Sequence, residues 1–197
     1  MTATGNAIPA PLSKNASRIP GEPDMWFFVF FESLIFASYF CVYLFFRAQD
    51  ERAFLQAQSH LSLVLGVLAT IILLTSSLVM ALCVQQARAG RHLVAIRLVY
   101  VTAGLGLAFF ALKTAEWVRL IHDGQTFTKN DFMQYYFFLT GMHGLHLLIG
   151  FVVLGILVYQ LSDPQRRSQE VVETCATYWH TVDLYWVMIF AMLYVVR

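Results

Sequence analysis

Long apolar stretches separated by short polar ones organise this chain of 197 residues. Five of the stretches are long enough to cross a bilayer, because about 20 helical residues span roughly 30 Å of hydrocarbon. They cover residues 25–46, 61–84, 98–121, 131–161 and 174–196. Short connections make neighbouring helices run antiparallel. We therefore predict an all-α fold, a compact integral membrane bundle of five transmembrane helices.

The composition agrees with a membrane protein. Hydrophobic residues make up 58% of the chain and charged residues 13%, whereas a soluble domain carries about 25% charged residues. The formal net charge of +1 argues against a nucleic-acid partner, which needs a basic surface. Cys41, Cys83 and Cys175 each lie in or beside an apolar stretch. We interpret them as small buried hydrophobic residues and not as a disulfide or metal set.

The first 23 residues differ from the rest. They are polar, rich in Ala, Ser and Pro, and without the apolar core of a signal peptide. We expect residues 1–23 to form a disordered tail, or to lie along a neighbouring subunit, and residues 24–197 to form the transmembrane domain. Basic residues outside the membrane number seven on the N-terminal side and five on the other. This small bias favours a cytoplasmic N-terminus.

Several polar residues lie at membrane depth within these stretches. His143 and His146 are three residues apart, as are His180 and Asp183, so each pair lies on one helix face. A charge at the centre of a membrane helix costs roughly 2.5–3.5 kcal/mol, so such residues face the bundle interior or a partner. We predict two tiers of contacts, Glu116 with His143 and Asp183 with His146.

The remaining buried charges each allow two interpretations. Glu32 lies about 10 Å below the start of the first stretch, where apolar surroundings disfavour the charged form of a carboxyl. It is either a neutral acid bonded to the next helix or a proton-handling or lipid-contacting acid that faces a partner subunit. Lys113 and Glu116 are three residues apart. They form either an intrahelical ion pair or part of a substrate or proton path.

The histidines also allow a metal or haem site. Helical bundles build metal sites from inward-facing Glu-x-x-His pairs, and two imidazoles can ligate haem. Here the pairs are His-x-x-His and His-x-x-Asp. One alternative is therefore a freestanding membrane metal or haem protein that uses His143, His146 and His180. The other is a hydrogen-bonded network without metal. A small proton-coupled transporter is a third possibility, against which the lack of internal repeats argues.

Four pieces of sequence together resemble one family. They are Gly-Met-His-Gly-Leu-His-Leu-Leu-Ile-Gly at 141–150, Tyr-Trp-His-Thr-Val-Asp-Leu-Tyr-Trp at 178–186, Ala-Glu-Trp at 115–117, and the stretch around Glu32. Together, and in their order along the chain, they resemble subunit III of the haem-copper oxidases, over residues 25–197. The family usually has seven helices, and this chain resembles the five-helix form without the first two. The cleft that holds lipids in longer members therefore cannot form within this chain.

The resemblance implies a non-catalytic subunit with no haem, copper or other metal of its own. Such a subunit docks on the catalytic subunit I, beside subunit II, in the inner membrane of a bacterial cell. It keeps proton uptake fast, limits inactivation during turnover and binds phospholipid. Glu32 matches the family's carbodiimide-sensitive membrane acid. The family's polar motif is matched by Glu116, His143, His146, His180 and Asp183.

The chain also departs from the family pattern. Lys113 stands where many oxidase members carry a glutamine, and Tyr159-Gln160 stands where many carry an arginine that contacts lipid phosphate. The next basic residues are Arg166 and Arg167, which we take, with Trp26, as lipid or interface contacts. Lys113 and the residues at 20–21 and 130–132 are more similar to the branch associated with nitric oxide reductase.

Overall fold

The computed structural model describes residues 22–196, and nearly all of them lie in helices. In this range six α-helices are followed by one π-helical turn: α1 (Pro23–Gln49), α2 (Glu51–Gln58), α3 (Leu63–Arg88), α4 (His92–His122), α5 (Asp131–Ser162), α6 (Gln169–Phe190) and η1 (Ala191–Val195). No strand occurs among the described residues, which confirms the all-α prediction. Of the expected tail, residues 1–21 lie outside the described residues.

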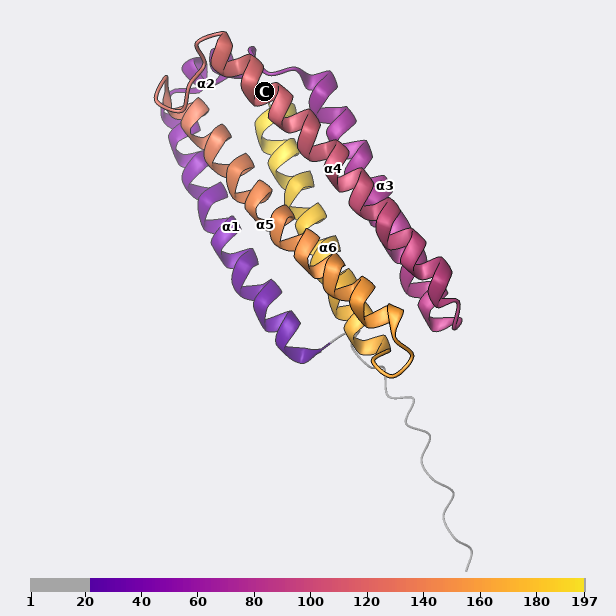
Figure 1. The fold of residues 1–197 in the computed structure, drawn as a ribbon. Helices are drawn as coiled ribbons and strands as arrows, with labels where there is room; N and C mark the ends of the chain where they lie inside the picture. Colours follow the sequence, from indigo (N-terminus) through magenta and orange to yellow (C-terminus); the bar gives the residue numbers. More distant parts are fainter. Residues whose placement is uncertain (1–21, 197) are drawn as a thin grey trace, which may run out of the picture.

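The long helices lie side by side in an elongated antiparallel bundle (Figure 1). The α3–α4 hairpin forms one flank, α1 and α5 form the other, and α6 runs between the two flanks. α6 packs against α1, α3 and α5. α6 is therefore the central helix of the bundle, and this position determines where the side chains of α6 point.

Four helices, α1, α3, α4 and α5, are long and apolar enough to cross a membrane. α6, the fifth predicted span, does not meet that measure. It carries polar side chains such as His180 and Asp183 among its aromatic residues. A central helix buries these side chains against other helices and not against lipid, so it need not be apolar all round. The bundle is therefore a membrane bundle with four spans recognisable by composition.

The helix ends follow from local sequence. Pro23 occupies the first turn of α1, where its fixed φ suits a helix and its missing N–H is not needed. Asn130 caps α5, with its side-chain oxygen 2.8 Å from the Met133 nitrogen. Asp50 caps α2 in the same way, at 3.1 Å from the Ala53 nitrogen. We expected only a short connection between the stretches 25–46 and 61–84. Asp50 followed by Glu51 was the helix-start signal for α2 that we missed.

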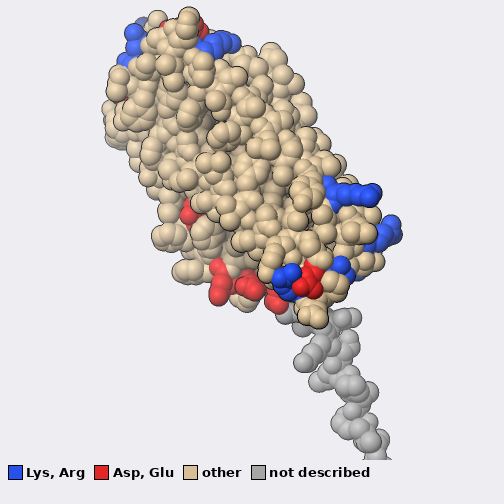
Figure 2. All heavy atoms as spheres, in the orientation of Figure 1, with Lys and Arg blue, Asp and Glu red and all other residues tan. Residues whose placement is uncertain are grey.

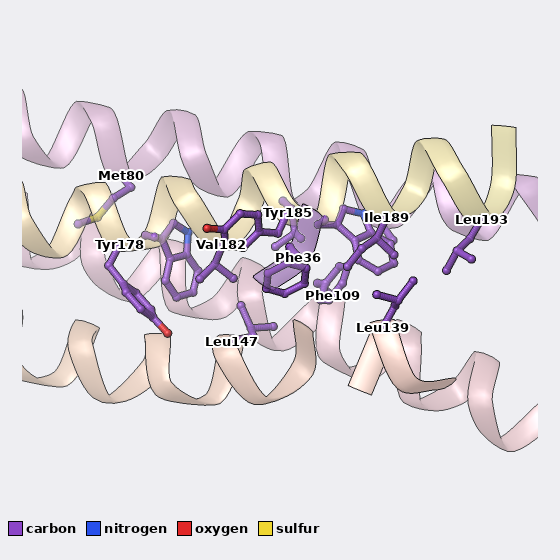
Figure 3. Close-up of a cluster of buried hydrophobic side chains, with 14 of the residues drawn as sticks. Phe36, Met80, Phe109, Leu139, Leu147, Tyr178, Val182, Tyr185, Ile189 and Leu193 are labelled. Carbon is purple, nitrogen blue, oxygen red and sulfur yellow. The ribbon is translucent and has the colours of Figure 1, made fainter. Parts of the chain in front are cut away.

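Large aromatic side chains fill the centre of the bundle. Trp179 and Trp186 of α6 are fully buried, and Figure 3 shows residues of α6 facing Phe36 of α1, Phe109 of α4 and Leu147 of α5. Gly150 of α5 permits this packing, because a Cβ atom there would lie 2.9 Å from the Trp179 ring. The close approach of α5 to α6 therefore depends on a glycine at this position.

The surface separates charge from apolar area. Basic and acidic side chains gather at the two ends of the molecule, and the band between them is almost free of charge (Figure 2). On α1 this band exposes large side chains, with Phe27 75% and Phe30 63% accessible. Such a surface suits lipid or a neighbouring subunit better than water.

Candidate functional site

The carboxyl group of Glu32 on α1 lies against the imidazole of His146 on α5. Glu32 Oε2 is 3.1 Å from His146 Nε2, and the two side chains are only 16% and 9% accessible. On its other side the ring approaches the Met142 carbonyl oxygen, 2.8 Å from Nδ1. Because a carbonyl can only accept, Nδ1 carries a proton. The Glu32–His146 contact therefore contains one further proton, bound to either the carboxyl oxygen or Nε2.

Aromatic rings enclose this pair on the bundle side. The Phe36 ring lies 5.6 Å from the His146 ring and stacks on Tyr185 of α6 at 4.3 Å. The Tyr185 hydroxyl is 3.0 Å from Ser33 Oγ, one residue after Glu32. Glu32 therefore bonds another helix, as the first alternative required, but that helix is α5 and not the next one in the chain. The predicted partner of His146, Asp183, was wrong.

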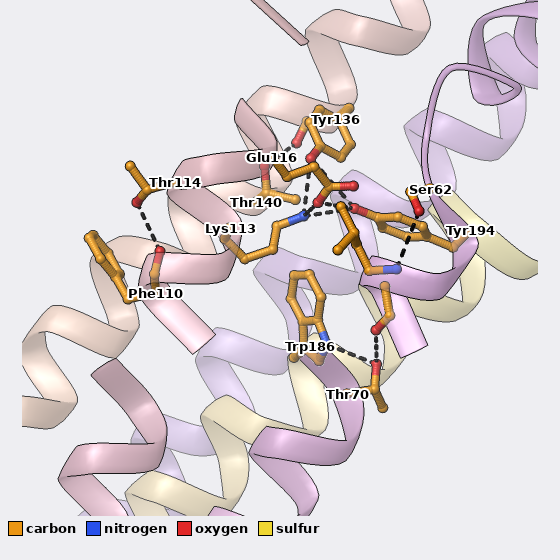
Figure 4. A network of polar contacts seen from close by, with 12 residues as sticks. Ser62, Thr70, Phe110, Lys113, Thr114, Glu116, Tyr136, Thr140, Trp186 and Tyr194 are labelled. Atoms are coloured by element: carbon orange, nitrogen blue, oxygen red, sulfur yellow. Dashed lines mark hydrogen bonds and ion pairs between the residues drawn. The ribbon is translucent and has the colours of Figure 1, made fainter. Parts of the chain in front are cut away.

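A second buried cluster surrounds Lys113 (Figure 4). Its ammonium group contacts the carboxylate of Glu116, as the predicted intrahelical ion pair requires. It also donates to Tyr136 of α5 at 3.0 Å and to Tyr194 of η1 at 2.7 Å. Tyr194 in turn donates to Glu116 at 2.8 Å. The ion-pair prediction is confirmed, while the two tyrosines were missed because they come from distant parts of the chain.

His143 takes no part in either cluster. Both of its ring nitrogens are buried without a hydrogen-bond partner, so the predicted contact with Glu116 was wrong. The imidazole lies among aromatic rings, 5.5 Å from Phe109 and 5.2 Å from Trp186 between centroids. Glu116 is occupied by Lys113 and Tyr194 instead, because a carboxylate gains more from a cation than from a neutral imidazole.

Three residues of α6 meet hydroxyl groups on α3, although nothing in the helical spacing predicted this. Trp179 donates to Ser76 at 3.0 Å, His180 Nδ1 lies 2.6 Å from Ser77, and Trp186 donates to Thr70 at 3.1 Å. This face of α6 therefore points toward α3. The signal in the sequence was a set of hydroxyl residues inside an apolar stretch.

Asp183 lies on this same part of α6 and makes no hydrogen bond to His146 of α5. It is 3% accessible, and neither carboxylate oxygen has a hydrogen-bond partner. The hydroxyl of Ser77 on α3 is near this carboxyl group, without a hydrogen bond of ordinary geometry. Spacing of three residues correctly placed His180 and Asp183 on one face, but it could not say toward which helix that face is turned.

The predicted interface residues lie near the end of the bundle where α1 begins. Trp26 is 42% accessible. Arg166 pairs with Asp163 at 2.9 Å and lies over the Tyr159 ring at 3.9 Å. Arg167 donates to the carbonyl oxygen of Leu161 at 3.0 Å. All three are compatible with contacts to lipid headgroups, which stay a prediction.

The histidines do not converge on a common point. His146 bonds Glu32, His180 bonds Ser77, and His143 lies among aromatic rings. Within residues 22–196, no group of three His, Cys, Asp or Glu side chains is arranged to hold a metal ion. The arrangement therefore offers proton-carrying groups in separate clusters, and gives no support to a three-histidine metal site.

Comparison with known proteins shows which family the chain belongs to. The family model for cytochrome c oxidase subunit III matches residues 22–196. A probable cytochrome c oxidase subunit 3 of Nocardia farcinica is 29% identical over 170 residues, which cover 84% of this chain and 83% of the relative. The quinol oxidase subunit 3 of Bacillus spizizenii is 31% identical over 175 residues, covering 86% and 83%. The haem-copper oxidase subunit I+III of Aeropyrum pernix is 27% identical over 180 residues, covering 87% and 22%. The chain belongs to the cytochrome c oxidase subunit III family.

Proposed function

We propose that this chain is the accessory, non-redox subunit III of a bacterial haem-copper oxidase complex, and that it docks on the catalytic subunit I and supports proton uptake there. Membership of the subunit III family supports the accessory role. The observation that carries the proton role is the Glu32–His146 contact, a proton-sharing pair held between α1 and α5 at membrane depth.

The chemistry of this pair suits a proton reservoir. With Nδ1 fixed as a donor, the extra proton is either on Glu32, giving a neutral pair, or on His146, giving an ion pair. Moving the proton between the two positions changes local charge without importing an ion. Because the Glu32 side chain is partly accessible at the bundle surface, the pair can exchange its proton with a group on a docked subunit.

The proposed partner is subunit I, with subunit II in the same complex. The Aeropyrum pernix relative is named as a fusion of subunits I and III, which supports direct contact between the two chains. We further propose that α6 crosses the membrane as a fifth span within the bundle, with the N-terminus in the cytoplasm of the bacterial cell. Phospholipid is expected at Trp26, Arg166 and Arg167.

The Glu32→Gln variant tests the proton role. The amide keeps a hydrogen bond to His146 but cannot release a proton, so we expect normal assembly with slower turnover where proton uptake limits the rate, at high pH. The measurement is oxygen uptake by the purified complex as a function of pH. Glu51→Gln, on the exposed surface of α2, is the matched control. Equal turnover of wild type and Glu32→Gln at high pH would refute the proposal.

A second candidate function is the equivalent accessory subunit of a quinol oxidase or a nitric oxide reductase. Relatives of similar identity are named as cytochrome c oxidase and quinol oxidase subunits, and Lys113 is similar to the nitric-oxide-reductase-associated branch. Affinity purification through this chain, with identification of the large subunit that elutes with it, distinguishes the three complexes. A haem Soret band or bound metal in the isolated chain would instead favour a freestanding redox protein.

A further inference from the structure

A groove lies between α1, α3 and α6, lined along α6 from Glu173 to Leu184. It has a volume of about 530 Å³. The ion pair of Arg88 with Glu173, 2.9 Å apart, lies on its wall near the α1 end, and His180 lines it further along α6. His180 is seven residues beyond Glu173, so it lies about 10 Å deeper along the helix.

His180 connects this groove to the helix interface behind it. Its imidazole is half-buried, and Nδ1 lies 2.6 Å from the hydroxyl of Ser77 on α3. Either atom can be the donor, since both imidazole and hydroxyl can donate and accept. The ring therefore has one nitrogen committed to Ser77 while its edge borders the groove.

The carboxyl group of Asp183 lies about one helical turn after His180 on α6. It is 3% accessible, and both oxygens lack a hydrogen-bond partner. An ionised carboxylate buried without a partner is strongly unfavourable, so a buried acid of this kind takes up a proton or serves a function. The Ser77 hydroxyl is near this carboxyl group, without a hydrogen bond of ordinary geometry between them. His180 borders the groove and bonds Ser77, and Asp183 follows three residues later on the same face of α6.

We propose that Asp183 is an internal proton-binding carboxyl, and that it exchanges its proton with water at the α1 end of the bundle through Ser77 and His180. A proton binds Nε2 of His180, the Nδ1 proton moves to Ser77 Oγ, and the Ser77 hydroxyl proton passes to Asp183. Asp183 becomes neutral, and His180 stays neutral with its proton on the other nitrogen. The reverse sequence releases the proton.

The other ionisable groups around α6 have surroundings of their own and do not bond Asp183. Glu32 of α1 and His146 of α5 bond each other, and His143 of α5 lies among aromatic rings. None of them is hydrogen-bonded to Asp183. At the groove mouth, Arg88 and Glu173 neutralise each other. The site is thus separate from the Glu32–His146 pair, and the inference does not depend on the proposed function of that pair.

Infrared spectroscopy of the purified complex tests the inference. The carboxyl stretching band lost in Asp183→Asn identifies the group, and transfer to D₂O then measures how fast its proton exchanges. We expect Ser77→Ala and His180→Gln to slow this exchange by about 100-fold, the lower end of what a positioned proton carrier contributes. Thr75→Ala is the matched control, because the exposed Thr75 hydroxyl of α3 bonds only its own helix at the Ile71 carbonyl.

The outcomes are distinct. Slow exchange in both relay variants, with Thr75→Ala and Glu32→Gln like wild type, supports the relay whether or not Glu32 affects turnover. Exchange as fast as wild type in Ser77→Ala would overturn it. So would the absence of a protonated Asp183 band at every pH at which the complex stays assembled. If Asp183→Asn fails to assemble, aspartate labelled with ¹³C at its carboxyl carbon identifies the band in the wild-type complex instead.

Discussion

At the scale of single residues, the chain buries its charges in three different ways. Lys113 is surrounded by Glu116, Tyr136 and Tyr194, which use all of its donors. Glu32 bonds one imidazole. Asp183 has no hydrogen-bond partner. A fully partnered charge stabilises one packing arrangement, whereas a charge with few partners is free to change its protonation state. The three sites therefore suit different roles.

The Lys113→Met variant tests the structural role of the first site. It leaves the Glu116 carboxylate, 3% accessible, without its cation, which costs about 3–5 kcal/mol for a buried pair. Thermal unfolding in detergent measures the loss. Arg119→Met on the same helix is the control, because its ion pair with Asp123 is exposed on both sides and such pairs contribute about 0–1 kcal/mol. Equal melting temperatures for the two variants would contradict the assignment.

At the scale of elements, α6 decides the arrangement of the others. Its bulky aromatic side chains fill the space between the two flanks, and its indole N–H groups bond hydroxyls of α3. α5 can approach it closely because Gly150 faces Trp179. Small residues on one helix opposite large ones on the next give close packing in a membrane, where the hydrophobic effect does not drive helix association.

The Gly150→Ala variant tests this contact. The added Cβ would lie 2.9 Å from the Trp179 ring, and overpacking of this kind costs about 1–3 kcal/mol. Gly155→Ala on the same helix is the control, because nothing lies within 4 Å of a Cβ there and alanine favours helix by about 1 kcal/mol. We expect thermal stability to fall in the first variant only. A loss in both would point to the helix backbone and not to the contact.

The short helix α2 is hydrogen-bonded to the turn that follows α6. Gln58 of α2 donates to the carbonyl oxygens of Leu193 at 3.1 Å and Val196 at 3.0 Å. Arg47 of α1 donates to the Val196 oxygen as well, at 2.8 Å. These bonds satisfy carbonyls that the helix end leaves unpaired. They also hold the turn that carries Tyr194, so the connection between α1 and α3 helps to complete the Lys113 cluster.

At the scale of the whole molecule, the distribution of charge matches a bilayer. The charged ends are separated by an apolar band (Figure 2), and the helices run antiparallel between them (Figure 1). The α3–α4 and α5–α6 connections share one end with the start of α1, and the α4–α5 connection lies at the other end. The positive-inside rule then predicts which end is cytoplasmic.

Cysteine labelling checks this orientation. With Cys41, Cys83 and Cys175 replaced, Gln125→Cys in the α4–α5 connection is expected to react with a membrane-impermeant maleimide in spheroplasts. Gln165→Cys in the α5–α6 connection is expected to react only after the membrane is permeabilised. The reverse pattern would place the N-terminus outside the cytoplasm, and reaction of both positions without permeabilisation would contradict the antiparallel crossing.

The sequence by itself determined the long helices. The predicted stretch 131–161 is observed as Asp131–Ser162, because length, hydropathy and an Asn cap are local properties. It also determined the Lys113–Glu116 pair, since residues three apart on one helix are neighbours wherever the helix is placed. The same local signals predicted five spans, and four of the described helices are long and apolar enough to cross a membrane. These signals could not recognise α6 as the centre of the bundle.

Only the tertiary structure decided which helix each polar face meets. His146 bonds Glu32 and not Asp183, and His180 bonds Ser77, because the rotation of α6 about its axis is determined by how Trp179 and Trp186 pack between the flanks. Tyr136 and Tyr194 reach Lys113 from α5 and η1 for the same reason. Periodicity along one helix determines which residues share a face, whereas the direction of that face depends on packing against every neighbour at once.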